Sequence, residues 1–213
     1  MAQRPKQNNT RNEAREASIR AVIDAAEVLF SHQGYDGTSL NSIAVRSGVS
    51  KHHILYLFGT KEGLWTKTVE DLFERVDAAF LKKRQLGTDF SLEELMQQYV
   101  DVSMLYPAYV YIPHIEGMQE SWRCKLLGEK YLRAHVLRYR SLIQVLIDKG
   151  DLPEISSVNL QNMIYGGVQD FFTRRCLWKH AIGTDTVSAE FLQDYLKTVS
   201  QMLRSRSNLD VAR

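Results

Sequence analysis

The sequence predicts an all-α protein. Three observations support this fold class. Apolar residues recur with a period close to that of a helix, as in Ile19, Val22, Ile23, Ala26 and Phe30, which follow one helix face. No segment shows the alternating apolar and polar residues of a half-buried strand. Capping residues, glycines and prolines stand between the periodic segments, where helices are expected to begin and end.

The N-terminal part is expected to form three helices after a short arm. Residues 1–14 are polar and basic and predict a flexible arm, and residues 15–60 predict the three-helix domain. The first helix should end near Gly34, because glycine is common just past a helix C-terminus. Thr38 and Ser50 are candidate N-caps for the second and third helices, since each hydroxyl can accept a hydrogen bond from a free backbone N–H.

Residues 38–63 have the pattern of two short helices joined by a tight turn, TSLNSIAVRSGVSKHHILYLFGTKEG. Gly48 stands at the corner, where its backbone can take a turn conformation that other residues resist. The second of the two helices is expected to present His52, His53 and Tyr56 outward. A helix presented in this way has the build needed to enter a DNA major groove.

A fourth helix, capped by Thr60, is predicted over residues 61–86 and connects this domain to the rest of the chain. Its apolar stripe continues for several turns. A break in composition at residues 87–89 then begins a larger helical domain, residues 87–206, followed by a frayed tail at 207–213.

The larger domain is expected to consist of helices only. Ser91 and Glu94 have the spacing of a capping box at its first helix. Pro107 and Pro113 are each expected to break a helix, because proline lacks the backbone N–H and clashes with the preceding turn. The remaining helices are predicted over residues 120–149, 157–179 and 186–205.

The composition is that of a folded protein and does not by itself indicate a partner. The 213 residues are 44% hydrophobic and 24% charged, and the net charge is +2. Residues 1–20 hold five Lys and Arg against two Glu, directly before the predicted helix pair. This local excess is as consistent with a phosphate-binding arm as with a solvated tail.

Cysteine usage and hydropathy narrow the class of protein further. Cys124 and Cys176 have no metal-ligand spacing, so we expect reduced thiols and neither a metal nor another cofactor. No apolar run approaches the length of a membrane span, and no secretory signal is visible at the N-terminus. The sequence therefore predicts a cytoplasmic protein with no membrane partner.

Polar residues around the predicted helix pair are candidates for DNA contacts. Imidazole side chains such as those of His52 and His53 can donate hydrogen bonds to guanine or phosphate. Lys61 lies in the first turn of the fourth helix, where a cation is unfavourable for the helix dipole unless a phosphate is near. For each candidate the alternative is a solvated or packing role. The residues expected to bind DNA are Arg11, Arg15, Thr38, Ser50, Lys51, His52, His53, Tyr56 and Lys61.

This stretch resembles the DNA-binding domain of the TetR family of bacterial transcriptional regulators. The resemblance implies a homodimer whose small N-terminal domain binds a palindromic double-stranded DNA operator. It also implies a larger C-terminal domain that dimerises and binds a small-molecule effector of unknown identity, with repression as the default. The matching residues are Phe30, Gly34, Tyr35, Thr38, Ile43, Ala44, Gly48, Val49, Ser50, Ile54, Phe58, Lys61 and Glu62.

One departure from the family pattern narrows the resemblance. Many members carry Tyr at the position of Leu55, whereas here the phenol stands one position later, at Tyr56. The stretch VSKHHILYLFGTKE is in this respect similar to the subgroup of the pyrimidine-utilisation repressor. The segments Tyr106-Pro107 and Ile143–Gly150 also look similar to that subgroup.

An effector site is expected in an aromatic-rich segment that two prolines bend, because such a segment can form a wall of a cavity between helices. Farther along the chain, Gln169 offers an amide that can both donate and accept hydrogen bonds. An ordinary helical core is the alternative for every one of these residues. The expected ligand-binding residues are Tyr106, Tyr109, His114, Trp122, Tyr165, Gln169 and Phe172.

The dimer interface is expected in the last two long helices. Tyr165-Gly166-Gly167 places two glycines in a helix at a cost of about 1 kcal/mol each relative to alanine, and permits close approach of another helix. An apolar stripe at residues 192–203 supplies a second face.

Two other functions are alternatives to a ligand-responsive repressor. The C-terminal domain of a constitutive or architectural DNA-binding regulator would only dimerise. An enzyme would need a hydrolytic site from His114, Glu116, Cys124 and His135. The sequence contains no nucleophile elbow, metal-ligand spacing or phosphate loop, so we expect no enzymatic activity.

Overall fold

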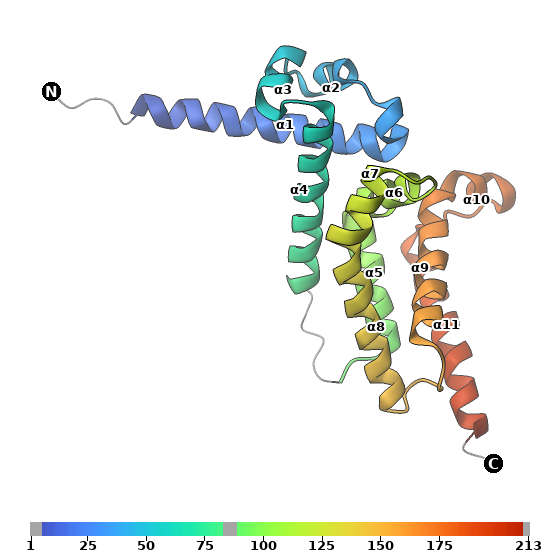
Figure 1. Ribbon diagram of the computed structural model, residues 1–213. Helices are drawn as coiled ribbons and strands as arrows, with labels where there is room; N and C mark the ends of the chain where they lie inside the picture. Colours follow the sequence, from blue (N-terminus) through green and yellow to red (C-terminus); the bar gives the residue numbers. More distant parts are fainter. Residues whose placement is uncertain (1–5, 83–88, 211–213) are drawn as a thin grey trace. The chain divides into compact units, whose positions relative to one another are not determined.

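The computed structural model describes residues 6–82 and 89–210, and within these ranges all regular secondary structure is helical (Figure 1). The all-α prediction is confirmed. The chain divides into two compact units, Met1–Arg75 and Val76–Arg213. Among the described residues, we find no helix with the length and apolar character needed to cross a bilayer.

Unit 1 contains α1 (Lys6–Gly37), α2 (Leu40–Ser47), α3 (Lys51–Phe58) and the first part of α4 (Lys61–Lys82). The predicted apolar face of α1 is buried except for Ile19, which is half-buried, and α2, α3 and α4 add buried side chains to the same core. These residues pack because burying a large aliphatic or aromatic side chain stabilises the fold by about 1.5–3 kcal/mol. The core residues of this unit include Val22, Ile23, Ala26, Phe30, Ile43, Ile54, Leu64, Trp65, Val69 and Leu72.

Helix α1 begins earlier than the sequence predicts. The expected flexible arm covered residues 1–14, but the chain is helical from Lys6 onward. Glu13, Ala14 and Arg15 are good helix formers, and they continue the helix in the N-terminal direction. Residues 1–5 of the arm lie outside the described residues. At the other end, the chain leaves the helical conformation at Gly34, with φ 68° and ψ 176°, where the sequence predicts the helix end.

The N-cap of α2 is Ser39 and not Thr38. Ser39 Oγ accepts a hydrogen bond from the Ser42 N–H at 3.0 Å, and Ser42 Oγ accepts one from the Ser39 N–H at 3.1 Å. Thr38 is instead buried, and its hydroxyl donates to the Gly34 carbonyl at 2.7 Å. The reciprocal pair satisfies two free amides, whereas Thr38 alone would satisfy one, so the cap moves by one residue.

The caps predicted for α3 and α4 are confirmed. Ser50 Oγ accepts from the His53 N–H at 3.2 Å. Thr60 Oγ1 accepts from the Gly63 N–H at 3.0 Å. Helix α4 is described as far as Lys82, so the last residues of the predicted connecting helix, 83–86, lie outside the described residues.

Unit 2 is built around four helices, α5, α8, α9 and α11, which run side by side (Figure 1). The predicted capping box begins the first of them: Ser91 Oγ accepts from the Glu94 N–H, and Glu94 Oε2 accepts from the Ser91 N–H. The elements are α5 (Leu92–Leu105), α6 (Ala108–Glu116), α7 (Trp122–Leu126), the π-helix η1 (Leu127–Leu132), α8 (Arg133–Asp148), α9 (Ser157–Thr173), α10 (Arg175–Ile182) and α11 (Ala189–Asp210).

The two prolines of this unit act differently. Pro107 follows the end of α5 as predicted and is the N-cap of α6. Pro113, predicted to break a helix, lies inside α6. It removes one N–H from the helix, but the Gly117 N–H still bonds to the Pro113 carbonyl at 2.9 Å, so the last turn closes. The prediction of a break at Pro113 was wrong.

The later helices follow the prediction with three differences. The helix predicted over 120–149 is present but contains the π-helical segment η1. The helix predicted over 157–179 is interrupted at Arg174, with φ −110° and ψ 16°, and so becomes α9 and α10. Helix α11 continues to Asp210, into the region predicted to be frayed.

Candidate DNA-binding site and effector region

The turn between α2 and α3 is fixed by backbone geometry and by one buried residue from each helix. Gly48 has φ 71° and ψ 6°, a conformation that glycine adopts without strain, and its N–H bonds to the Ala44 carbonyl at 3.0 Å. Ile43 of α2 and Ile54 of α3 are fully buried in the core of unit 1. The two helices are therefore held as a rigid helix-turn-helix.

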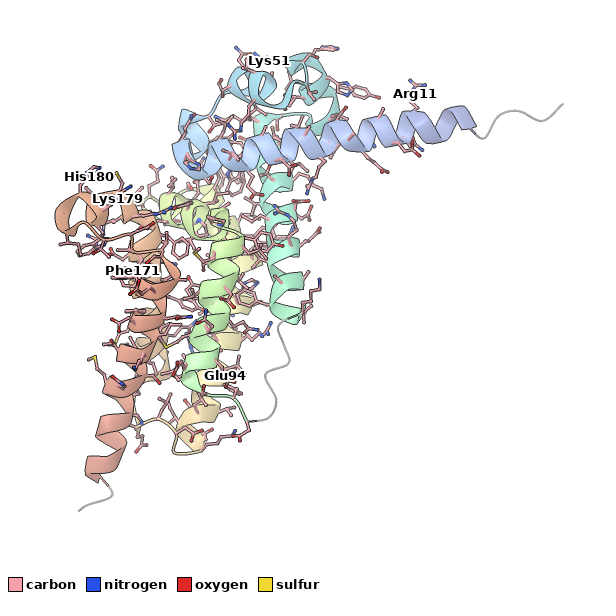
Figure 2. All side chains as sticks on the ribbon, turned by 180° about the vertical axis from the view of Figure 1, so that it is seen from behind. Arg11, Lys51, Glu94, Phe171, Lys179 and His180 are labelled. Atoms are coloured by element: carbon pink, nitrogen blue, oxygen red, sulfur yellow. The ribbon has the colours of Figure 1, made fainter. Side chains whose placement is uncertain are left out.

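Helix α3 exposes several polar side chains, while its Ile54 is buried. Lys51 and His52 are exposed, and Figure 2 shows Lys51 at the surface at the beginning of the helix. Tyr56 is 75% exposed and stacks on His53, with ring centroids 5.9 Å apart. These side chains offer an ammonium, two imidazoles and a phenol as hydrogen-bond donors without any of them supporting the core.

Lys61 is positioned by an aromatic neighbour. Its Nζ lies 4.1 Å from the centroid of the Tyr35 ring, and Tyr35 in turn packs against Phe30 and Trp65. A cation over a ring is stabilised by about 0.5–1 kcal/mol at an exposed site. This contact offsets part of the unfavourable interaction between a lysine and the N-terminal end of α4. The sequence did not reveal this role of Tyr35.

Residues 11–17 of α1 add no side chain to the core of unit 1. Residues 11–17 are all exposed, and Figure 2 shows Arg11 on the projecting part of the helix. Arg11 and Arg15 are separated by four residues and so lie on the same face of the helix. Sequence reasoning missed a further exposed cation, Arg46, which lies in the last turn of α2.

Helices α1 and α4 are joined by an ion-pair network within unit 1. Arg75 forms ion pairs with Glu27 and, at 2.9 Å, with Asp71, and Asp71 also pairs with Arg20. Burial raises the pKa of Glu27, and the Arg75 guanidinium opposes that effect. The network joins the middle of α4 to α1, the helix that supports the helix-turn-helix.

Unit 2 contains a buried cluster of aromatic rings between α5, α6, α8 and α9. Tyr99 stacks on Tyr165 with centroids 4.4 Å apart, and Tyr139 and Tyr109 contact Tyr99 edge to face. Burial raises the pKa of Tyr99 to about 12, while its hydrogen bond with Gln169 acts in the opposite direction. We call Tyr99, Tyr109, Tyr139 and Tyr165 the tyrosine cluster.

One side of the tyrosine cluster is bonded to α4. His135 of α8 shares a hydrogen bond with Tyr109 Oη at 3.1 Å and another with Asp77 Oδ1 of α4 at 2.8 Å. Burial lowers the pKa of His135, and Asp77 counteracts this effect only in part. Phe80 of α4 packs edge to face on the same imidazole.

A buried acceptor beside the cluster lacks a donor. Gln98 of α5 donates through Nε2 to the Phe80 carbonyl at 3.3 Å, but its Oε1 is buried and has no hydrogen-bond partner among the described residues. An unsatisfied buried acceptor costs about 1–3 kcal/mol, so a donor from a bound molecule would stabilise this region.

The structure brings together only part of the residues expected to bind an effector. Tyr109 and Tyr165 belong to the tyrosine cluster, and Gln169 bonds to it. Phe172 is buried at the end of α9. Tyr106 is half-buried at the end of α5.

The other two expected ligand residues are at the surface. His114 is exposed, and Trp122 is 42% exposed at the start of α7. Both stand in the proline-bent aromatic segment that predicts a ligand site, but the helical phase of α6 and the start of α7 turn them outward. Tyr99 and Tyr139, which the selection left out, are buried instead.

The residues of the alternative hydrolytic site have different partners or lie at the surface. Glu116 forms a buried ion pair with Arg123 at 2.7 Å, and His135 is bonded to Tyr109 and Asp77. His114 is exposed. Within residues 6–82 and 89–210, no group of His, Cys, Asp and Glu is arranged to hold a metal ion.

Comparison with known proteins shows a family match in the N-terminal part of the chain. The family model for bacterial regulatory proteins, tetR family, matches residues 22–66, which span the buried face of α1, the helix-turn-helix and the start of α4. This part of the chain matches the TetR family. The matched residues contain the helix-turn-helix described above.

Relatives from bacteria extend the similarity beyond the TetR DNA-binding domain. The chain is 27% identical to the HTH-type transcriptional regulator RutR of Escherichia coli K12 over 172 residues, 78% of this chain and 79% of RutR. This similarity agrees with the subgroup that the residues of α3 resemble. Over 76 residues, 36% of this chain and 40% of the relative, it is 32% identical to IcaR of Staphylococcus aureus, a negative transcriptional regulator of a biofilm operon.

The likeness to solved structures extends through unit 2. A γ-butyrolactone receptor matches with a TM-score of 0.62 at 20% identity, covering 86% of this chain and 98% of the receptor. At this identity the likeness establishes the fold. The predicted architecture, an N-terminal helix-turn-helix followed by a helical C-terminal domain, is confirmed.

Proposed function

We propose that this TetR-family protein is a ligand-responsive repressor that binds a palindromic operator as a homodimer and is released by a small effector. The observation that carries the proposal is the outward face of α3, where Lys51, His52 and Tyr56 are exposed above a buried Ile54. In a helix-turn-helix, this is the face that reads base edges in the major groove.

Each candidate residue has a role in this proposal that follows from its position. His52 and His53 contact base edges or phosphate, and Lys51 and Tyr56 contact phosphate. Ser50 acts through the N-cap of α3. Thr38 is not proposed as a contact, because its hydroxyl is buried and bonded to the backbone.

Further cations lie on the other helices of unit 1. Lys61 begins α4, Arg46 ends α2, and Arg11 and Arg15 extend along the free part of α1. Each of these contributes to affinity by displacing counterions from the phosphate backbone, without reading the sequence. We expect them to set the salt dependence of binding.

The homodimer is proposed to form through α9 and α11. Met163 of α9 is 69% exposed and Met202 of α11 is 64% exposed, and Gly166 on α9 is open to solvent. Gly167 serves packing within the subunit, because a Cβ there would lie 2.1 Å from Tyr195 Oη of α11. Dimerisation would place two α3 helices for half-sites about 34 Å apart.

The effector is proposed to bind at the tyrosine cluster of unit 2. Gln98 Oε1 offers an unused acceptor there, and Gln169 offers an amide. Because Asp77 and Phe80 of α4 contact His135, a ligand that rearranges the cluster would act on α4 directly. It can shift the equilibrium only by its difference in affinity for the two states.

A gel-shift assay tests the proposal. The purified protein should retard a fragment of its own upstream promoter at low salt, and failure to do so would end the proposal. A thermal-shift screen against metabolites then separates the repressor from a constitutive or architectural regulator. An effector should raise the melting temperature and weaken DNA binding, whereas the constitutive regulator would show neither response to any compound.

A further inference from the structure

A second region of unit 2 has the features of a binding site and lies on α7, η1 and α8. A groove of ≈ 800 Å³ runs along these helices. Cys124, Gly128, Leu132 and Val136 follow each other at intervals of four residues and line the groove. The volume falls in the range of small-molecule sites, about 300–1,000 Å³.

The shape of the groove follows from the π-helical segment Leu127–Leu132. Such segments insert an extra residue into a helix and are frequent at functional sites. Gly128 lies within it and lines the groove, and a Cβ at this position would meet nothing within 4 Å. The absence of a side chain there leaves the groove open between Cys124 and Leu132.

The two halves of the groove differ in charge. The half near α7 carries both signs, with Lys125 beside the carboxylates of Glu120 and Glu129. The half on α8 is lined by Arg133 and Arg140 around Leu132, Val136 and Leu137, and no carboxylate lines it. Leu137 is 46% exposed, so this half combines an apolar surface with two cations.

Arg140 carries an unused donor. Its Nε is buried and has no hydrogen-bond partner among the described residues, although Arg140 lines the groove. A buried guanidinium N–H without an acceptor is costly, and the planar fork of arginine is suited to a carboxylate. A ligand that brings an acceptor to this end would satisfy it.

We propose that the groove binds an amphipathic carboxylic acid, with its carboxylate at Arg140 and its aliphatic chain along Val136 and Leu132. Eight residues separate Leu132 from Arg140, which corresponds to about 12 Å along the helix. A chain of medium length covers this distance. The site is separate from the tyrosine cluster, and the proposal does not depend on which ligand releases DNA.

Calorimetric titration of the full-length protein with octanoate, below its micelle-forming concentration, tests the proposal. Octanoate should bind saturably, once per chain, and butyrate should bind at least about tenfold more weakly because it lacks the chain. Arg140→Gln should weaken octanoate binding about tenfold or more, because it removes one charge-assisted contact. A tenfold change corresponds to about 1.4 kcal/mol. Lys197→Gln, an exposed cation on α11, is the matched control and should leave binding within twofold.

Two further variants keep the test decisive. Leu137→Glu adds a carboxylate to the groove from an exposed position, so it should weaken binding even if Arg140→Gln does not fold. Tyr165→Phe alters the tyrosine cluster and should leave octanoate binding unchanged. The proposal is overturned if octanoate does not saturate, if Leu137→Glu binds as the wild type does, or if Tyr165→Phe abolishes binding. Gel shifts with the same variants report DNA binding independently, so the two proposals fail separately.

Discussion

Loss of one partner should lower the free energy of unfolding more for a buried ion pair of this protein than for an exposed one. The Glu116–Arg123 pair is the buried case. Its atoms are 2.7 Å apart, and the two side chains are 3% and 8% exposed. Arg123→Met removes the cation and leaves a carboxylate without its cation in a buried place. Loss of one partner of a buried pair costs about 3–5 kcal/mol. We expect the free energy of unfolding to fall by this amount.

The Lys67–Glu70 pair provides the matched control. Its distance is similar, 2.9 Å, but its side chains are 48% and 34% exposed. Lys67→Met should therefore lower the free energy of unfolding by less than about 1 kcal/mol. The double variant Glu116→Gln with Arg123→Met should recover most of the loss, because no charge remains buried.

Urea unfolding followed by circular dichroism measures all four proteins. For a chain of this size, a loss of 3–5 kcal/mol corresponds to a fall of roughly 6–20 °C in the melting temperature. The reasoning is refuted if Arg123→Met costs no more than Lys67→Met, or if the double variant is as unstable as the single one.

Three further predictions follow from backbone and packing geometry and from titration. Gly48→Ala should lower stability by about 1–2 kcal/mol in urea unfolding, because φ is +71° at the turn; an unchanged midpoint would contradict the left-handed turn. Gly167→Ala should lower the free energy of unfolding by about 1–3 kcal/mol, since its Cβ would overlap Tyr195 Oη. Gly166→Ala, in open space, should not lower the stability of the subunit. Equal effects of the two substitutions would contradict the packing of α9 on α11. His135 has a folded pKa below its unfolded value, so the unfolded chain binds more protons and stability should be lost as pH falls below about 6.5. His135→Asn should reduce this pH dependence in unfolding curves at pH 8 and pH 5.5, and an unaltered dependence would show that another group is responsible.

Local rules predicted the helix-turn-helix well. The caps at Ser50 and Thr60, the glycine turn at Gly48 and the outward placement of Tyr56 depend on residues close in sequence, and all are present. The cap of α2 was misplaced by one residue because two serines form a reciprocal pair, which outcompetes a single threonine.

The effector region was less predictable because it depends on contacts between distant segments. The cluster joins Tyr99 of α5 with Tyr139 of α8 and Tyr165 of α9, and helical periodicity alone does not say which faces of three helices meet. Trp122 was selected for its aromatic ring, but it lies at the surface. The chemical type of a side chain does not predict its place in the effector region unless the packing of the helices is also known.

The central claim is that the exposed face of α3 reads DNA. Fluorescence anisotropy with the protein's own upstream promoter fragment, at one fixed salt concentration, tests it most directly. The variant His52→Ala with His53→Ala should bind at least about tenfold more weakly than the wild type, because base contacts contribute about 1–3 kcal/mol each. His180→Ala, an exposed histidine on α10, should bind as the wild type does. Equal affinity of the double variant and the wild type, with both proteins folded, would contradict the claim.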